Sequence, residues 1–146
     1  MTRPDMVLSD PRFTAEIEIT VPFHDVDAMG VVWHGHYLRY MEIAREALLG
    51  QFDYGYRQMK ASGYLWPVVD ARVKYRAPLI FEQRIRVQAR IEEYENRLRI
   101  GYRIFDGPSG KNTTSGYTIQ VAVEQHSHEL CFVSPPVLLQ RMGLLP

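Results

Sequence analysis

The chain of 146 residues has little of what several classes of protein require. Its one cysteine, Cys131, excludes an intrachain disulfide and a four-cysteine metal site. Its 17 Lys and Arg residues are balanced by 17 Asp and Glu residues, which leaves no overall attraction to nucleic acid or to an acidic membrane surface. No apolar run approaches the roughly 20 residues of a membrane-spanning helix, and the first residues lack the apolar core of a signal peptide. We therefore expect a cytoplasmic protein that neither binds nucleic acid nor inserts into a membrane.

The composition that remains is that of an ordinary folded domain. Hydrophobic residues make up 46% of the chain and charged residues 23%, proportions that disordered chains do not show. The length suits one domain that buries its own core. We therefore predict a single domain over residues 1–146, with the Pro-, Asp- and Arg-rich residues 1–12 as a flexible arm.

Apolar periodicity predicts an α+β fold. Apolar and polar residues alternate in several segments, which is typical of half-buried strands, whereas the apolar residues of 36–49 repeat at helical spacing. The strands are expected at 15–21, 64–75, 83–93, 97–105 and 117–123, and the helices at 36–49, 53–62 and 137–142. This order indicates an antiparallel sheet with one long helix packed on a face. Since one helix cannot cover both faces and both edges of such a sheet, we expect a partner subunit.

Titratable side chains crowd the segment just before the long helix. His24, His34 and His36 fall there, and His126 and His128 form a second His-x-His pair near the end of the chain. A zinc site needs three or four ligands that converge, and a pair at a helix start does not secure that geometry. The pattern therefore favours ordinary polar residues, and we expect neither a metal nor another cofactor.

Asp27 is the stronger candidate for chemistry. Gly30 permits a sharp turn after it, and Val31, Val32 and Trp33 are expected to anchor the loop in the core. Such anchoring would hold Asp27 in a poorly solvated place that suits a base or nucleophile, although a turn or capping aspartate is the plainer interpretation. The helix that follows favours the catalytic interpretation of Asp27, because the first backbone N–H groups of a helix are unpaired and can stabilise an oxyanion. A carboxylate facing such N–H groups is what acyl hydrolysis needs, and the Gly-x-Ser-x-Gly motif of serine hydrolases is absent.

The string DVDAMGVVWHGHY, from Asp25 to Tyr37, resembles the signature of the hot-dog-fold acyl-CoA thioesterases. It is most similar to the 4-hydroxybenzoyl-CoA thioesterase group and its Tol-Pal-associated branch. The run from Val73 to Pro78 is similar to that family's strand ending in Tyr-x-x-Pro. The resemblance implies a hot-dog fold, in which an antiparallel sheet wraps around a long central helix. It also implies active sites at a subunit interface, a homodimer or homotetramer, and an acyl-CoA or acyl-carrier-protein substrate.

The resemblance implies roles for individual residues as well. Asp27 matches the family's catalytic carboxylate, which attacks the thioester carbonyl or activates water, and the backbone N–H of His34 matches the group that polarises this carbonyl. Substrate contacts are expected from Phe23, Gly30, Val32, Trp33, Tyr37 and Arg76. Phe23 stands where the Tol-Pal branch usually has a tyrosine, so a phenolic hydroxyl is lost. Together with Trp33 and Trp66, Phe23 favours an aromatic or bulky acyl group.

Two segments of the chain carry Arg and Lys side chains suited to binding the phosphates of coenzyme A. Arg72, Lys74 and Arg76 alternate on one predicted strand, and a second strand carries Arg84, Arg86 and Arg90. A solvated outer face is the plainer interpretation of most of these residues. Two other functions stay open: a non-catalytic acyl-CoA-binding protein, and a hot-dog hydratase or dehydratase, which places its catalytic residues differently along the helix.

Overall fold

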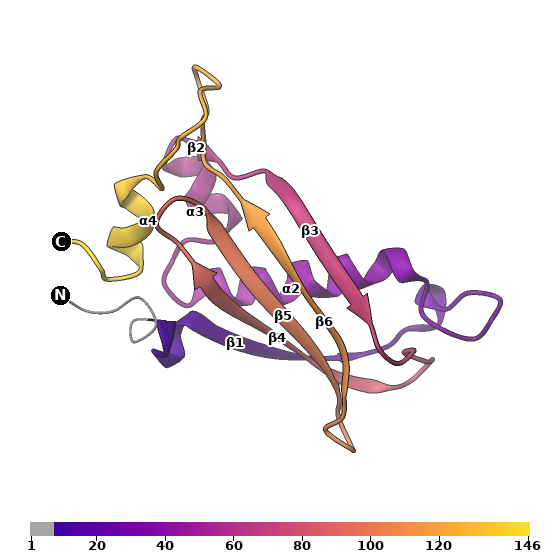
Figure 1. Ribbon diagram of the computed structural model, residues 1–146. Helices are drawn as coiled ribbons and strands as arrows, with labels where there is room; N and C mark the ends of the chain where they lie inside the picture. The colour runs from indigo at the N-terminus through magenta and orange to yellow at the C-terminus, as the bar shows by residue number, and fades with distance from the viewer. Residues whose placement is uncertain (1–7) are drawn as a thin grey trace.

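The computed structural model describes residues 8–146, which form a five-stranded antiparallel sheet crossed on one face by a long helix (Figure 1). The strand order is β1-β4-β5-β6-β3, so β1 and β3 are the two edges. The strands are β1 (Thr14–Thr20), β3 (Val68–Tyr75), β4 (Arg84–Glu93), β5 (Leu98–Asp106) and β6 (Asn112–Gln120), and the short β2 (Tyr64–Leu65) and β7 (Val123–Glu124) pair separately. The predicted α+β plan is confirmed.

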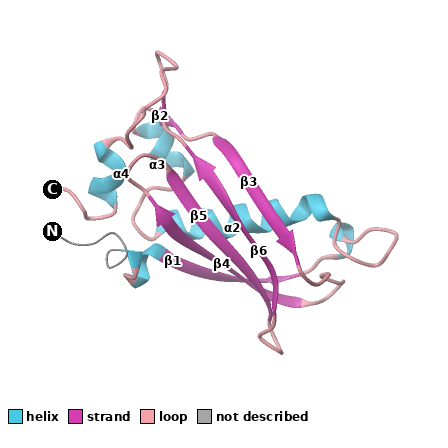
Figure 2. Cartoon of the chain, in the orientation of Figure 1, coloured by secondary structure: helices cyan, strands magenta, loops and turns pink. Residues whose placement is uncertain are grey.

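The helices lie on one side of the sheet and at one end of it (Figure 2). They are α2 (Tyr37–Gly50), α3 (Tyr56–Ala61) and α4 (Pro136–Arg141), with 3₁₀ turns η1 (Pro11–Phe13), η2 (Phe23–Asp25) and η3 (His34–His36). The long α2 packs mainly against β1 and β4 and buries Tyr40, Met41, Ala44 and Leu48, as its spacing predicts. Ala47, predicted to share that face, is exposed.

Alternation along the central strands builds the core. On β4 the side chains of Ile85, Val87, Ala89 and Ile91 face α2 and are at most 1% exposed, while the arginines between them point to the other face. Burying each large aliphatic side chain contributes about 1.5–3 kcal/mol. This part of the sheet agrees with the predicted pattern.

Two predicted strand boundaries are wrong. The expected strand over 64–75 is divided into β2 and β3 around Pro67, which has no N–H to donate to a ladder. The last long strand begins at Asn112 instead of 117, because Thr113 and Thr114 are buried polar residues that apolar periodicity does not detect. Their hydroxyls are satisfied locally, Thr113 donating to the carbonyl of Ile104 at 3.2 Å.

The expected flexible arm over 1–12 lies partly outside the described residues. Within its described part Leu8 packs against the core, and the carboxylate of Asp10 accepts the backbone N–H of Arg12 at 2.9 Å to cap η1. Within residues 8–146 no helix combines the length and apolar character needed to cross a bilayer.

Candidate active site

The loop between η2 and η3 carries Asp27, and it projects beyond the beginning of α2 (Figure 1). Val26 and Val32 form a single antiparallel bridge, and inside it the N–H of Asp27 donates to the carbonyl of Val31 at 2.9 Å. The N–H of Gly30 returns to the carbonyl of Asp27 at 3.0 Å, and Gly30 closes the turn with φ of +82°. This left-handed conformation explains the glycine. The bridge therefore sets Asp27 opposite Val31.

The Asp27 carboxylate stabilises the turn through one oxygen and leaves the other free. Its Oδ1 accepts the backbone N–H of Met29 at 2.8 Å, an Asx turn that orients the carboxylate. No other hydrogen bond to this carboxylate is found within residues 8–146. Asp27 is half-buried, so the expectation of a strongly desolvated carboxylate is only partly met. Its Oδ2 remains available to a substrate or a water molecule.

The start of the helical region offers unpaired N–H groups. The turn η3 continues directly into α2, so residues 34–50 form one helical run whose positive dipole end lies at His34. Trp33 precedes this run without a side-chain cap, and in the described part of the chain neither His34 nor Gly35 donates its backbone N–H to an acceptor. Both residues are exposed. These N–H groups are therefore free to bind an incoming carbonyl oxygen.

A shallow groove of about 280 Å³ opens beside these N–H groups. Its walls are Val32, His34, Tyr37, Tyr75, Arg76, Ala77 and Pro78, which unites four of the predicted site residues. Tyr75 fixes the helix start, since its hydroxyl donates to the carbonyl of His34 at 3.0 Å and its ring meets that of Tyr37 edge-on at 4.8 Å. Burial raises the pKa of the Tyr37 phenol, which therefore stays protonated at neutral pH.

The other predicted substrate contacts do not line this groove. Phe23 is 75% exposed and leans on Phe81, with ring centroids 5.5 Å apart. Trp33 is 48% exposed, so the expectation that it anchors the loop in the core is wrong, whereas Val32 is buried as expected. The Trp33 ring instead covers the backbone of Gly35, where any side chain would collide with it.

Sequence reasoning missed Asp25, the most buried carboxylate of the region. It is 1% exposed, and its Oδ2 accepts the Tyr40 hydroxyl at 2.5 Å and pairs with the Arg39 guanidinium. Burial alone would raise the pKa of Asp25, but these two partners outweigh it and hold the pKa below its usual value. The carbonyl of Asp25 also accepts the N–H of Trp33 at 3.1 Å. Asp25 therefore fastens the loop of Asp27 to α2, and the Asp-x-Asp string was its only sequence signal.

The histidines do not assemble a metal centre. His24 Nε2 and His36 Nε2 lie 3.6 and 3.9 Å from Oδ1 of Asp25, and His24 is largely exposed. Within the described residues no three His, Cys, Asp or Glu side chains are placed to hold a metal ion.

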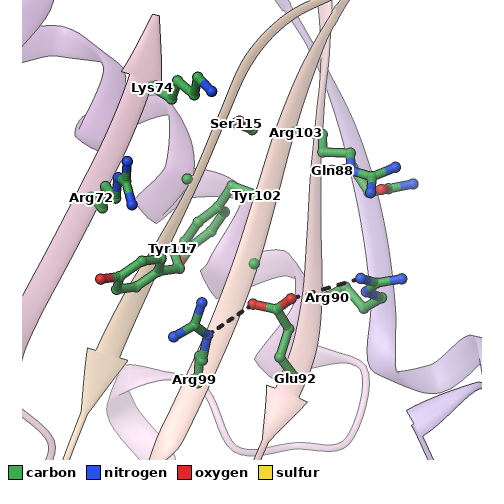
Figure 3. A pocket seen from close by; sticks show the side chains of 12 residues that line it. Arg72, Lys74, Gln88, Arg90, Glu92, Arg99, Tyr102, Arg103, Ser115 and Tyr117 are labelled. Atoms are coloured by element: carbon green, nitrogen blue, oxygen red, sulfur yellow. Dashed lines mark hydrogen bonds and ion pairs between the residues drawn. The ribbon is translucent and has the colours of Figure 1, made fainter. Parts of the chain in front are cut away.

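The predicted cations do not gather at one site. Arg72 and Lys74 face away from α2 and, with Arg90 and Arg99, rim a hollow of about 330 Å³ on the outer face of the sheet (Figure 3). Glu92 reaches between two of them, 3.2 Å from Arg99 and 3.7 Å from Arg90. Arg76 lines the groove beside His34 instead. Of the cations expected to serve CoA, only Arg76 therefore lies at the site.

Similarity to known proteins identifies the family of the chain. Residues 21–141 match the model of the thioesterase-like superfamily. The chain belongs to this superfamily. This thioesterase-like protein is 33% identical over 111 residues to a Bacillus subtilis protein provisionally named acyl-CoA thioesterase YneP, an alignment that covers 75% of the chain and 80% of the relative. It is 28% identical over 119 residues to the 1,4-dihydroxy-2-naphthoyl-CoA hydrolase of Thermosynechococcus vestitus, covering 80% and 77% of the two chains.

Solved structures place the thioesterase-like protein in the hot-dog fold that its signature implies. The DHNA-CoA thioesterase of Staphylococcus aureus superposes with a TM-score of 0.75 at 26% identity, covering 82% of this chain and 80% of the other. The predicted hot-dog fold is confirmed.

Proposed function

We propose that the protein hydrolyses an acyl thioester, of coenzyme A or of an acyl-carrier protein, to a free acid and a thiol. The observation that carries the proposal is the pair of unengaged N–H groups at His34 and Gly35, beside a groove and next to the loop of Asp27. A thioester carbonyl oxygen seated there gains two donors and the positive end of the helix dipole.

Asp27 supplies the other half of the chemistry. Its Oδ1 is held by Met29, so its free Oδ2 has a defined direction. This oxygen either attacks the carbonyl carbon or removes a proton from the attacking water. In both routes the C–S bond breaks, and the thiolate leaves and takes up a proton. When water attacks, its oxygen has already bonded to the carbonyl carbon, so the free acid forms at once; when Asp27 attacks, the acyl group is left on Asp27 as an anhydride, which water then hydrolyses to the free acid and the regenerated carboxylate. Water is the second substrate, and no metal or cofactor enters the scheme.

A homodimer completes the site in this proposal. The edge strand β3 contains no proline, and its apolar Val69 and Tyr75 are 58% and 49% exposed. An open edge of this kind is a template for another strand, and pairing with its own copy about a twofold axis is antiparallel. The groove at Tyr75 would then be closed by the partner's β3. A tetramer of two such dimers is compatible with the same pairing.

The names of the relatives support acyl-CoA as the thioester, since a Bacillus subtilis relative is named for it and the Thermosynechococcus vestitus relative for an aromatic acyl-CoA. Arg76, exposed at the groove, is suited to a phosphate of CoA. We further propose membership of the 4-hydroxybenzoyl-CoA thioesterase group, from the Asp25–Tyr37 signature, and a cytoplasmic location, in keeping with a single free cysteine.

Thiol release from a panel of short, long, branched and aromatic acyl-CoAs tests the reaction. Asn at position 27 keeps the Oδ1 acceptor for Met29 and removes the carboxylate, so Asp27→Asn should lower kcat/KM about 100-fold or more while the protein stays folded. The matched control is Asp53→Asn, at an exposed position with φ of 56° that Asn tolerates. Equal turnover by wild type and Asp27→Asn would refute the mechanism. Tight binding of acyl-CoA without cleavage would favour a non-catalytic binding protein.

A further inference from the structure

The hollow of about 330 Å³ on the outer face of the sheet is built by the register of four strands (Figure 3). Two neighbouring rows of residues cross β4, β5, β6 and β3 there: Arg90, Gly101, Tyr117 and Arg72 in one row, and Gln88, Arg103, Ser115 and Lys74 in the next. The small residues Gly101 and Ser115 lie between long side chains, so the floor of the hollow is low and its rim is high.

Positive charge dominates the lining of this hollow. Five cationic side chains line it, namely Arg72, Lys74, Arg90, Arg99 and Arg103. The one carboxylate in the lining belongs to Glu92, and Asp70 accepts the Tyr117 hydroxyl at 3.3 Å outside the lining. Within residues 8–146, Arg72, Lys74 and Arg103 form no ion pair. Three cations of the hollow are therefore left to an anion from solution.

The protein's own anion already occupies one end of the hollow. The Glu92 carboxylate lies 3.2 Å from Nε of Arg99 and 3.7 Å from Nη2 of Arg90. It lies over Gly101, because a Cβ at that position would come within 2.6 Å of the carboxyl carbon. A glycine inside a strand weakens the strand and often marks a place where another group approaches the backbone closely. Gly101 therefore makes room for an anionic group above the sheet.

Two of the unpaired cations face one another across the other end. Lys74 on β3 and Arg103 on β5 lie in one row two strands apart, so their Cα atoms are about 10 Å from one another. Both side chains can reach an anion placed above Ser115. Arg72, the next outward residue on β3, can reach a second anionic group beside the first. Phosphate groups suit this arrangement, because they accept the forked donors of arginine and the point charge of lysine.

The size and charge of the hollow favour a small ligand. A volume of about 330 Å³ is in the range of small-molecule sites. A second copy of the chain is disfavoured on this face, since it would place like charges together. The Arg76 groove beside His34 shares no lining residue with the hollow, so the two are separate places for a phosphate.

We propose that this hollow binds a small oligophosphate, either the free inorganic ion or the phosphate groups of a nucleotide. Lys74 and Arg103 hold one phosphate group, and Arg72 holds the next. Glu92 keeps Arg90 and Arg99 in place at the other end. The inference does not depend on the proposed thioesterase function, because no residue of the hollow takes part in that chemistry.

Calorimetric titration of the full-length protein with inorganic pyrophosphate and with ADP, at low ionic strength, tests the site. Lys74→Met and Arg103→Met should each weaken pyrophosphate binding about 10-fold or more, the effect of losing a charge-assisted hydrogen bond. Glu92→Gln removes a like charge and should tighten binding about threefold or more. Arg84→Met is the matched control, because Arg84 is exposed on β4 outside the hollow and its loss should change binding less than about twofold.

Comparison of the two probes identifies the source of the phosphates. Equal affinities would support recognition of the phosphate groups alone, and ADP binding about 10-fold tighter would support a nucleotide. Arg76→Met separates the hollow from the groove and should leave pyrophosphate binding unchanged. The assignment is overturned if wild type binds neither probe, if Lys74→Met and Arg103→Met bind like wild type, or if Arg84→Met or Arg76→Met weakens binding as much as they do.

Discussion

The Tyr40 hydroxyl donates a 2.5 Å hydrogen bond to a carboxylate, Asp25, that is 1% exposed. Tyr40 lies on α2 and Asp25 at the start of the loop of Asp27, so this bond joins the two parts of the proposed site. Arg39, the neighbour of Tyr40, neutralises the same oxygen. The position of the loop therefore depends on a buried ionic contact as well as on apolar packing.

Removing this donor should destabilise the fold. Tyr40→Phe keeps the ring and leaves Asp25 with a weaker set of partners, so we expect a loss of about 1.5–3 kcal/mol in the free energy of unfolding. Urea denaturation measures it. Tyr56→Phe is the control, since Tyr56 is 67% exposed and its change should stay within about 0.5 kcal/mol. An equal, small effect for both variants would show that the Asp25 contact adds no stability.

Acid should weaken the fold through the same carboxylate. The pKa of Asp25 is lowered in the folded state, so the unfolded chain binds more protons between the two values and stability falls as the pH drops below about 4. Asp25→Asn should be less stable at neutral pH and show a shallower acid slope. Part of the slope should persist, because hydrogen bonds from Arg12 and from Ser109 lower the pKa of Asp10 and of Asp106. Unfolding free energies measured between pH 3 and 7 compare the slopes, and parallel curves would contradict the assignment.

Gly30 should be intolerant of a side chain for conformational reasons alone. A Cβ there meets nothing within 4 Å, but φ is +82°. Gly30→Ala should therefore cost about 1–2 kcal/mol of stability, and Gly30→Asn less, since Asn adopts positive φ more readily. Urea denaturation of the two variants gives the order. If alanine is tolerated as well as asparagine, the loop has another accessible conformation.

Gly35→Ala should act on the site through Trp33. The new methyl group would occupy the space of the Trp33 ring, which must move away from the helix start. We expect altered tryptophan fluorescence and at least about a 10-fold loss of kcat/KM, since the unengaged N–H groups lie at this point. The control is Gly50→Ala at the other end of α2, where a Cβ meets nothing within 4 Å and should stabilise the helix by about 0.5–1 kcal/mol. Unchanged fluorescence and turnover in Gly35→Ala would contradict the role of Trp33.

A charge on the open edge should separate the subunits. Val69→Lys places an ammonium group on β3, a change that disfavours edge pairing. Light scattering should report about twice the monomer mass for wild type and the monomer mass for the variant, with thioesterase activity lost. Val133→Lys, at a position 66% exposed away from β3, should remain dimeric and active. An active monomer would refute the shared site.

The regular helices and strands could be predicted from the sequence, because the spacing of apolar residues is set by residues that are close together in the chain. The buried face of α2 and the alternation along β4 follow from residues close together in the chain. The exposure of Trp33 does not, because an apolar residue beside a loop can bury its ring in the core or lie on a neighbouring glycine. Only tertiary structure distinguishes these outcomes.

The site was predictable only where the thioesterase signature extends. Val32, His34 and Tyr37 line one groove with Arg76, and their role in binding substrate stays a prediction. Asp25 was missed because its partners lie on the following helix, and nothing in the spacing shows that its side chain turns inward. The groove itself joins Val32 and Tyr37 to Tyr75 and Arg76, residues far apart in sequence that no local pattern connects.

The groove lies at the Tyr75 end of β3, the edge strand proposed to pair with a second copy, and this placement has a genetic consequence. If each active site takes Asp27 from one chain and its closing wall from β3 of the other, defects in the two parts can complement one another. A subunit with Asp27→Asn and a subunit whose β3 no longer closes its partner's groove would each be inactive alone. Mixed and allowed to exchange, about half of the dimers would be hybrids, each with one site intact in both halves. Two dead proteins would then recover about a quarter of the wild-type rate.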